Sequence, residues 1–592
     1  MGYFAFFLIL AVACLLWSAA CTAAAARSDR RRALWLFLGL ALPVLALLPW
    51  LLASGYLAFD ARMRPNWFGA VLTVVLSALI GGIWISRAGM TAVASSSVAV
   101  ASRWPVIGLF AFAILAKAVS FGTLLILDNA VAAEARAMRV EAAEMMQAAL
   151  PPAPVDAENA ARLHLQAGAA IAAAPDLTAA DGPLADPQFD IASPAVGELL
   201  TRHAALVDTI RRAADMPGCR FARDWARPSI EMLLPEMQAM RTEARILALA
   251  ARRGSFEGRH AEAVADAVRL GSLGRQAGSE PILVSSLVGL AIDGEALSVV
   301  ADILPRLGPG DAALLDDPGL RDLVSAVPSI VRAVNGEEAF GLAMFADFAD
   351  GREDIHAFGR LSSDATPTFD EGHPLAFLAD PLMAIYRVFF LPADLAGYRD
   401  RFRKLRSTAA RSVDQRQGWP EMKRDIDAID TDPRRGPDGA LARLIVPATE
   451  AVFRAQSHAV ARHRAAEVLL AATRERLAAG ALPTAIDSLV PARLPSLPRD
   501  PFTSDSPMRA AFEAGELSVW SVGPNGTDDG GPVAAGNAPP ERGDDIGLRM
   551  RSAGPRAEAG DPAGFESNYG RAPPTLGPSP RHSAEDIAWK KG

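Results

Sequence analysis

The chain has few cysteines, and their positions exclude most cysteine chemistry. Cys14 and Cys21 lie in the first apolar segment, and Cys219 is the one cysteine in the rest of the 592 residues. A disulfide framework needs paired cysteines, so none can form after residue 128. The sequence also lacks a CxxC pair, which excludes the usual spacing of zinc ligands.

Basic residues are also outnumbered by acidic ones. Asp and Glu number 67 against 59 for Lys and Arg, which gives a net charge of −8. Proteins that bind nucleic acid need a basic surface, because they must neutralise phosphates. The composition therefore predicts that nucleic acid is not a partner.

Catalytic motifs are lacking as well. The sequence has no HExxH, GxSxG or P-loop, and no GxGxxG after a strand. It therefore carries none of the common metalloprotease, serine hydrolase or nucleotide-binding signatures. Two acid pairs, Glu337–Glu338 and Asp293/Glu295, stand at helical positions. Adjacent acids on a helix point about 100° apart, which favours a solvated helix face over a catalytic pair.

Two histidines in the C-terminal half are candidate metal ligands by residue type. His458 and His463 are five residues apart. Two ligands on one face of a helix are separated by four residues, as in HExxH. Both histidines are therefore interpreted as ordinary surface residues.

The sequence does contain long apolar runs near its start. Residues 3–25, 33–59, 67–86 and 105–127 are each long enough to span about 30 Å of hydrocarbon. The first and third loops between these runs carry more net positive charge than the second, so the positive-inside rule places both termini outside the cytoplasm. This pattern predicts a multi-pass protein of the inner (cytoplasmic) membrane, with the lipid bilayer as a partner and a large extracytoplasmic C-terminal domain. Lys117, in the fourth run, is either functional or a side chain that snorkels.

The expected fold class is mainly α. By composition the chain divides into a region of four transmembrane helices (1–127), a helical extension with a linker (128–190), an α-helical extracytoplasmic domain (191–445), a small α+β module (446–550) and a disordered tail (551–592). The helical domain is predicted because apolar residues recur there at i, i+3, i+4 and i+7. An irregular domain with solenoid-like packing is favoured over a true repeat array, which needs three or more units.

Two hairpins are predicted inside the helical domain. Residues 245–276 have small residues that let two helices approach closely around a turn at Gly254–Gly258. Residues 282–304 are more apolar and predict a second hairpin that forms the core.

Part of this region resembles a known group of proteins. The stretches that carry the resemblance are CRFARDW, LLPEMQAMRTEARILALAA and SEPILVSSLVGLAI. They are similar to membrane-anchored proteins of planctomycete-type bacteria, over most of residues 219–548. That group has no assigned chemistry, so the resemblance implies architecture alone.

The stretches GALPTAIDSLVPARLPSLPRDPF, GELSVWSVGPNGTDDGG and GDDIGLRM follow a long helical pattern near the C-terminus. Gly480 predicts the end of this helix, and residues 517–522 alternate as a strand does. The whole resembles the C-terminal domain of the type II secretion major pseudopilin, which implies a long helix, a small antiparallel sheet and a calcium loop. The basic leader and the Glu of a pseudopilin's start are absent here, so the chain is not expected to polymerise into a pilus.

A candidate metal site lies in this module. The loop 523–531 combines glycines with oxygen-bearing side chains, and Ca²⁺ takes six to eight oxygen ligands. By resemblance, Asn525 and Asp545 match ligand positions of the family, and Asp528, Asp529 and Asp544 are additional candidates. Asn525 replaces the usual Asp, and residues 532–542 lengthen the loop. The alternative interpretation is an acidic, solvated turn capped by Asn and Asp.

These features favour a non-enzymatic protein. The expected function is that of a membrane-anchored, extracytoplasmic binding or scaffold protein of the cell envelope, linked to secretion or surface assembly, with other envelope proteins as partners. One alternative is an envelope hydrolase that uses acids of the helical domain. The other is a small transporter or sensor in which the four apolar runs act directly.

Overall fold

The computed structural model describes residues 129–350, 386–430, 442, 449–531 and 545–551, with short gaps at 180–183, 185–189, 227, 229–233, 414–417, 504 and 514. The chain divides into two units. One contains residues 144–340, 401–432 and 448–592, and is called the main unit. The other contains residues 1–143, 341–400 and 433–447.

Helices make up most of the described residues. A helix covers residues 129–149. The further α-helices are α5 (Ala161–Ala172), α6 (Pro175–Thr178), α7 (Pro194–Arg202), α8 (Ala204–Ala214), α9 (Pro235–Phe256), α10 (His260–Ala277), α11 (Leu283–Ile303), α12 (Pro318–Ser325), α13 (Val331–Ala349), α16 (Leu391–Val413), α17 (Trp419–Asp430) and α19 (Thr449–Ala479). Short helical turns are η3 (Asp156–Glu158), η4 (Leu304–Arg306), η5 (Pro309–Asp316), η7 (Tyr386–Phe390) and η9 (Ile486–Leu489).

Local sequence signals set several helix ends. Proline occupies the first turn of α7 and α12, where its missing N–H costs nothing. Ser193 and Asp317 cap these two helices by accepting hydrogen bonds from backbone N–H groups. Gly258 follows α9 at φ 81° and Gly480 follows α19 at φ 84°, a backbone conformation that glycine adopts without strain.

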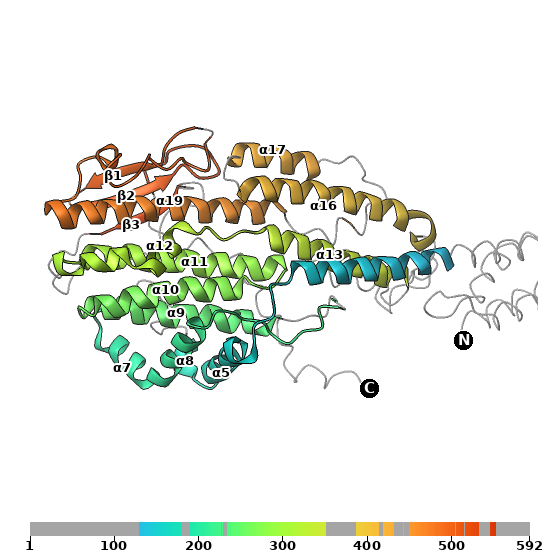
Figure 1. The fold of residues 1–592 in the computed structure, drawn as a ribbon, viewed down its shortest axis with the longest axis horizontal. Coiled ribbons are helices and arrows are strands. Elements are labelled where there is room, and N and C mark those ends of the chain that lie inside the picture. Colours follow the sequence, from blue (N-terminus) through green and yellow to red (C-terminus); the bar gives the residue numbers. More distant parts are fainter. Residues whose placement is uncertain are drawn as a thin grey trace, which may run out of the picture. The chain divides into compact units, whose positions relative to one another are not determined.

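The main unit is layered. In Figure 1, α9, α10 and α11 lie side by side, α19 follows, and the sheet covers the outer side of α19. The helices α5, α7 and α8 pack against the opposite side, on α9 and α10.

The sheet has three antiparallel strands in the order β1-β2-β3: β1 (Arg509–Glu513), β2 (Glu516–Ser521) and β3 (Ile546–Met550). Its register sets Arg509 of β1 opposite Trp520 of β2. Leu517 and Val519 of β2 are fully buried, as the alternating pattern requires. These two side chains belong to the same hydrophobic core as Leu247 of α9 and Leu469 of α19, so helices and sheet share one core.

The close packing of α10 on α11 depends on glycine. A Cβ atom at Gly289 would lie 2.7 Å from the carbonyl oxygen of Gly274 and 2.8 Å from Cα of Gly278. Neither neighbour is a movable side chain, so the two helices can approach this closely only because residue 289 has none.

In the second unit, the described residues form their own contacts. Arg139 forms ion pairs of 3.0 Å with both Asp347 and Asp350. The rings of Phe345 and Tyr398 are tilted against each other at 5.0 Å between centroids. These contacts join the helix at 129–149, α13 and α16.

The prediction of a multi-pass membrane protein requires a correction. Among the residues that the structure describes, no helix is both long and apolar enough to cross a membrane. The most apolar one, α11, has 21 residues but carries Asp293, Glu295 and Asp302, and charged groups are costly in hydrocarbon. The four runs between residues 3 and 127 lie outside the described residues, as does Lys117. The supported fold class is mainly α with a small three-stranded sheet, and the inner-membrane location is not retained.

The two predicted hairpins have different outcomes. The hairpin at 245–276 is confirmed as α9 and α10, with Ala248, Ala251, Ala263 and Ala267 buried between helices. The prediction of a hairpin at 282–304 is wrong, because residues 283–303 form the single helix α11. The predicted tail, beyond Arg551, lies outside the described residues.

Candidate functional site

The loop at residues 523–531 follows β2 directly. Gly523, Gly526, Gly530 and Gly531 all have positive φ, between 66° and 107°. Four such glycines let the backbone turn back on itself within nine residues. All residues from 525 to 530 are exposed, so the loop presents its tip to solvent.

Asp545 lies beneath this loop, at the start of β3. Its Oδ2 accepts hydrogen bonds from the backbone N–H groups of Asp529 (3.0 Å) and Gly531 (2.8 Å). Its Oδ1 is buried and has no hydrogen-bond partner among the described residues. Burial, together with the negative charges of Asp528 and Asp529, raises the pKa of Asp545. A buried carboxylate oxygen without a donor, near two further acids, suits a cation.

Asp528 is committed to contacts within the protein. One of its carboxylate oxygens accepts hydrogen bonds from Trp520 Nε1 (3.0 Å) and from the backbone N–H of Gly530 (3.2 Å). The other forms a 2.7 Å ion pair with Arg509 Nε. Burial opposes its ionisation, but these partners hold the pKa of Asp528 below its usual value. This carboxylate therefore has little capacity left for a metal ion.

The remaining predicted ligands are Asn525 and Asp529, which the structure describes, and Asp544, which it does not. Asn525 donates from Nδ2 to Asp529 Oδ2 (2.9 Å) and accepts at Oδ1 from the backbone N–H of Thr527 (2.8 Å), as in an Asx turn. Asp544 lies outside the described residues. Within the part of the chain that is described, no group of three or more His, Cys, Asp or Glu side chains is placed to hold a metal ion. The fit to calcium therefore rests on Asp545 and Asp529.

Asp500 was not expected to support this loop. It is buried, and its Oδ1 accepts hydrogen bonds from Ser521 Oγ (2.5 Å) and the backbone N–H of Phe502 (2.8 Å). Its Oδ2 accepts from the backbone N–H of Val522 (2.9 Å). In the sequence, Asp500 stands in a proline-rich stretch, directly before Pro501. The side chain instead fixes the end of β2, from which the loop begins.

A buried polar cluster joins four helices of the main unit. His164 of α5 contacts Glu243 Oε2 of α9 through Nδ1 (2.7 Å) and Gln276 Oε1 of α10 through Nε2 (2.9 Å). The amide nitrogen of Gln276 donates to the carbonyls of Ala213 and Met216, which fixes its oxygen toward the histidine. Both ring nitrogens therefore face acceptors. Burial opposes the charge, but Glu243 and Gln276 raise the pKa of His164 on balance.

Two ionisable groups adjoin this cluster. Cys219 is buried, and burial together with the nearby charges of Glu280 and Glu243 raises the pKa of its thiol to about 12. Glu280 is also buried, which raises its pKa to about 7 despite the positive charge of Arg223. A thiol that remains protonated is a poor nucleophile.

The interpretation of His458 and His463 as surface residues is wrong. His463 is 2% exposed, and its ring lies between Asp293 and the carbonyl of Val324. His458 lies against the ring of Phe502, and burial lowers its pKa to about 3. Residue spacing along one helix could not reveal partners on other helices.

The solvated-face interpretation of the acid pairs is also wrong. Glu337 accepts the backbone N–H of Leu283 at the start of α11 (3.1 Å), and burial raises its pKa. Glu338 is 4% exposed and pairs with Arg406 (3.1 Å). Glu295 pairs with Arg252 (2.7 Å). Each acid faces a partner from a distant part of the sequence.

Comparisons were made with protein-family models, with curated proteins and with solved structures. None of the three gives a match.

Proposed function

We propose that this protein is a non-enzymatic scaffold that binds another protein through the loop 523–531, and that calcium orders this loop. The observation that carries the proposal is the Asp545 carboxylate. It ties down the loop through Asp529 and Gly531 and keeps one buried oxygen without a donor. A cation at that oxygen would bring β3 and the loop together without altering the sheet.

The position of the loop supports a binding role. The loop is exposed, whereas β2, which precedes it, and β3, which follows Asp545, share the core of α11 and α19. An exposed loop on a rigid base can contact a partner with little loss of conformational entropy. The resemblance of residues 446–550 to the pseudopilin domain favours a partner from a secretion or surface-assembly system.

The interior of the main unit supports a non-enzymatic role. The buried groups His164, Glu243 and Gln276 are hydrogen-bonded to one another. Asp266, also fully buried, is paired with Arg211 and Arg269. Buried acceptors that are paired in this way support a structural role for these groups.

Site-specific photo-crosslinking tests the proposal. A photoreactive phenylalanine analogue is placed at Thr527, in the loop, in the full chain within its native cells. The matched control places it at Thr201, which is likewise an exposed threonine, in α7. We expect one discrete protein adduct from position 527 that is lost with Asp545→Asn, and none of that size from position 201. No adduct from position 527, or the same adduct from both positions, would contradict the proposal.

A further inference from the structure

The main unit contains a cavity of about 660 Å³ that is separate from the loop 523–531. Its wall is formed by Pro151–Pro154, by the segment from the end of α8 to Cys219, by one face of α10, and by residues at the starts of α12 and α13. Small-molecule sites have volumes of about 300–1,000 Å³. The cavity is therefore large enough for a metabolite-sized ligand.

The wall nearest Pro154 is held in place by backbone contacts. A Cβ atom at Gly218 would lie 2.8 Å from Pro154 Cβ, so the two segments touch. Asn159 reinforces this contact, because its side chain accepts from the N–H of Arg220 (2.9 Å) and donates to its carbonyl (3.0 Å). This wall is thus formed before any ligand arrives.

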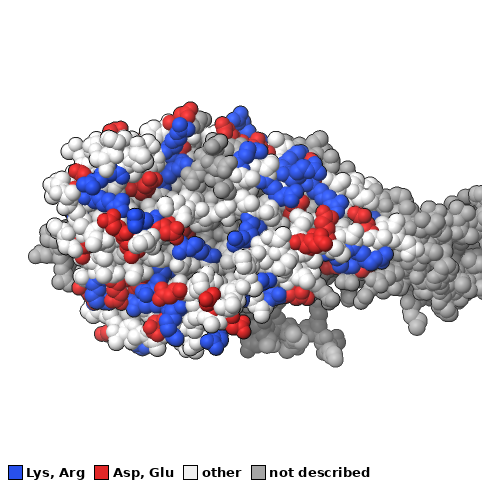
Figure 2. All heavy atoms as spheres, in the orientation of Figure 1, with Lys and Arg blue, Asp and Glu red and all other residues white. Residues whose placement is uncertain are grey.

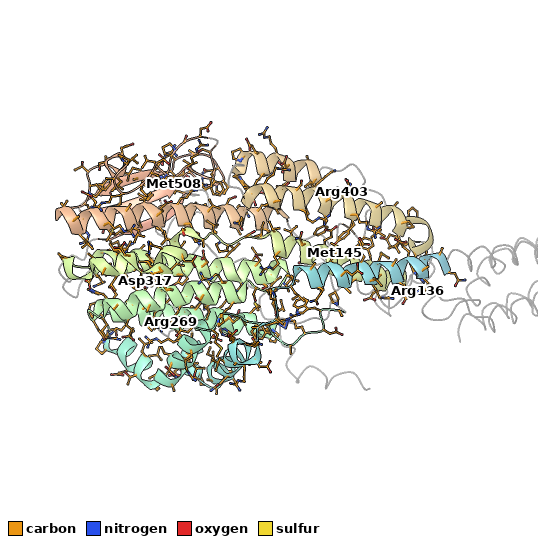
Figure 3. The ribbon with its side chains drawn as sticks, in the orientation of Figure 1. Arg136, Met145, Arg269, Asp317, Arg403 and Met508 are labelled. Atoms are coloured by element: carbon orange, nitrogen blue, oxygen red, sulfur yellow. The ribbon has the colours of Figure 1, made fainter. Side chains whose placement is uncertain are left out.

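The charged groups of the cavity are not balanced. Asp215 is paired with Arg269 (2.9 Å), and that arginine also contacts Asp266 (3.0 Å). Asp317 is engaged as the N-cap of α12, where it accepts from the backbone N–H of Leu320 (2.9 Å). Arg269 and Asp317 are labelled in Figure 3, on α10 and at the start of α12. Asp215 and Asp317, the two acids of the wall, therefore already have partners within the protein.

Two arginines of the wall have no acidic side chain in close contact among the described residues. Arg275 reaches Asp322 only at 3.7 Å and donates to Ser272 Oγ (3.0 Å). Arg332 is exposed, and no hydrogen bond or ion pair joins it to another described residue. On the face shown in Figure 2, by contrast, basic and acidic side chains mostly lie beside one another. Two unmatched guanidinium groups in one cavity attract an anion.

Part of the wall is apolar, beside the polar side chains of Ser272, Gln276 and Ser279. Pro151, Pro152, Pro217, Ala265 and Val268 line the cavity alongside the arginines. These side chains offer a surface for a ring or a short hydrocarbon body, and an apolar wall with a few polar groups is typical of sites for small organic ligands. An inorganic anion alone would leave this surface in contact with water.

We propose that this cavity binds a small organic anion, with its carboxylate or phosphate group between Arg275 and Arg332 and its apolar body against the proline-lined wall. Arg269 contributes positive charge to the same cavity but stays paired with its two acids. The proposal does not depend on the loop or on calcium.

Calorimetric titration of the full chain tests it, with benzoate and phenyl phosphate as probes. Inorganic phosphate and benzyl alcohol serve as controls that lack the apolar body and the charge, respectively. We expect saturable one-site binding of at least one aromatic anion, tighter than that of either control. Arg275→Gln and Arg332→Gln should each weaken it at least tenfold, whereas Arg321→Gln, at an exposed arginine of α12 outside the cavity, should leave it unchanged.

Two further measurements keep the test decisive. The melting temperature of each variant shows whether it remains folded, and Ser272→Phe offers a second variant that fills the cavity without removing charge. We expect this substitution to abolish binding in a folded protein. Absence of binding by both aromatic anions, binding that the two arginine substitutions and Ser272→Phe leave unchanged, or equally tight binding of benzyl alcohol would overturn the proposal.

Discussion

The imidazole of His463 in α19 lies between the carboxylate of Asp293 in α11 and the backbone carbonyl of Val324 in α12. Nε2 is 2.8 Å from Asp293 Oδ2, and Nδ1 is 2.9 Å from the carbonyl oxygen. Both ring nitrogens face acceptors, an arrangement that favours a proton on each. Burial opposes this charge, but Asp293 and Val324 raise the pKa of His463 on balance. His463 thus links three helices inside the core.

Removing this histidine should destabilise the protein strongly. His463→Gln leaves Asp293, which is 3% exposed, as a buried charge without its cationic partner. Breaking such a pair typically costs about 3–5 kcal/mol. Urea unfolding of the variant at pH 7 should show a loss of that order, whereas a loss below about 1 kcal/mol would contradict the charged pair.

The same pair predicts how stability changes with pH. The pKa of His463 is higher in the folded protein than its ordinary value of 6.5, so its contribution to stability is complete below about pH 6.5. The contribution is lost as pH rises through the folded-state pKa. The pKa of His164 is also raised, so it acts in the same direction.

Unfolding free energies between pH 6 and pH 9 measure this effect. The wild-type protein should lose stability over this range. The double variant His463→Gln/Asp293→Asn lacks the titrating pair and should lose less. Parallel pH profiles for the two proteins would show that His463 is not charged in the fold.

The thiol of Cys219 should be unreactive in the folded protein. Its pKa of about 12, against an ordinary value of 9.0, lowers the thiolate fraction at pH 8 by about 1,000-fold. In a Cys14→Ser/Cys21→Ser background, a thiol reagent should label the protein rapidly in urea and very slowly without it. Rapid labelling of the folded chain would contradict the burial of this residue.

Close approach of α10 and α11 predicts a cost at Gly289. Gly289→Ala inserts a methyl group 2.7 Å from the carbonyl oxygen of Gly274, so the helices must separate. Overpacking of this kind costs about 1–3 kcal/mol. Gly310→Ala is the control, because a Cβ atom there meets nothing within 4 Å. Equal melting temperatures for the two variants would argue against the tight contact.

The sequence predicted those parts of the fold that depend on local signals. The turn around Gly258, the end of α19 at Gly480 and the strand β2 all follow from residues close together in the chain. The single helix α11 was missed for a physical reason. Sixteen of its 21 residues are buried, so it has no polar face that would show the helical period.

The candidate site was predictable only in part. Asn525, Asp528, Asp529 and Asp545 do lie together around one loop. The sequence did not indicate that Asp528 is held by Arg509 and Trp520, because that contact depends on the register of β1 against β2. Polar pairs between distant residues, such as His463 with Asp293, were missed for the same reason.

The calcium dependence of the loop 523–531 is most directly tested by the melting temperature of the full chain with calcium and with chelator. At about 100 times the dissociation constant, a ligand of the folded state stabilises it by about 2.7 kcal/mol. We expect a rise of several degrees with calcium and a smaller one with magnesium, which demands stricter geometry.

Asp545→Asn should abolish this rise, and Asp505→Asn, at an exposed carboxylate outside the loop, should retain it. We expect this difference because the buried oxygen without a donor belongs to Asp545. The same melting temperature with calcium and with chelator, or a rise that Asp545→Asn leaves intact, would contradict a calcium-ordered loop.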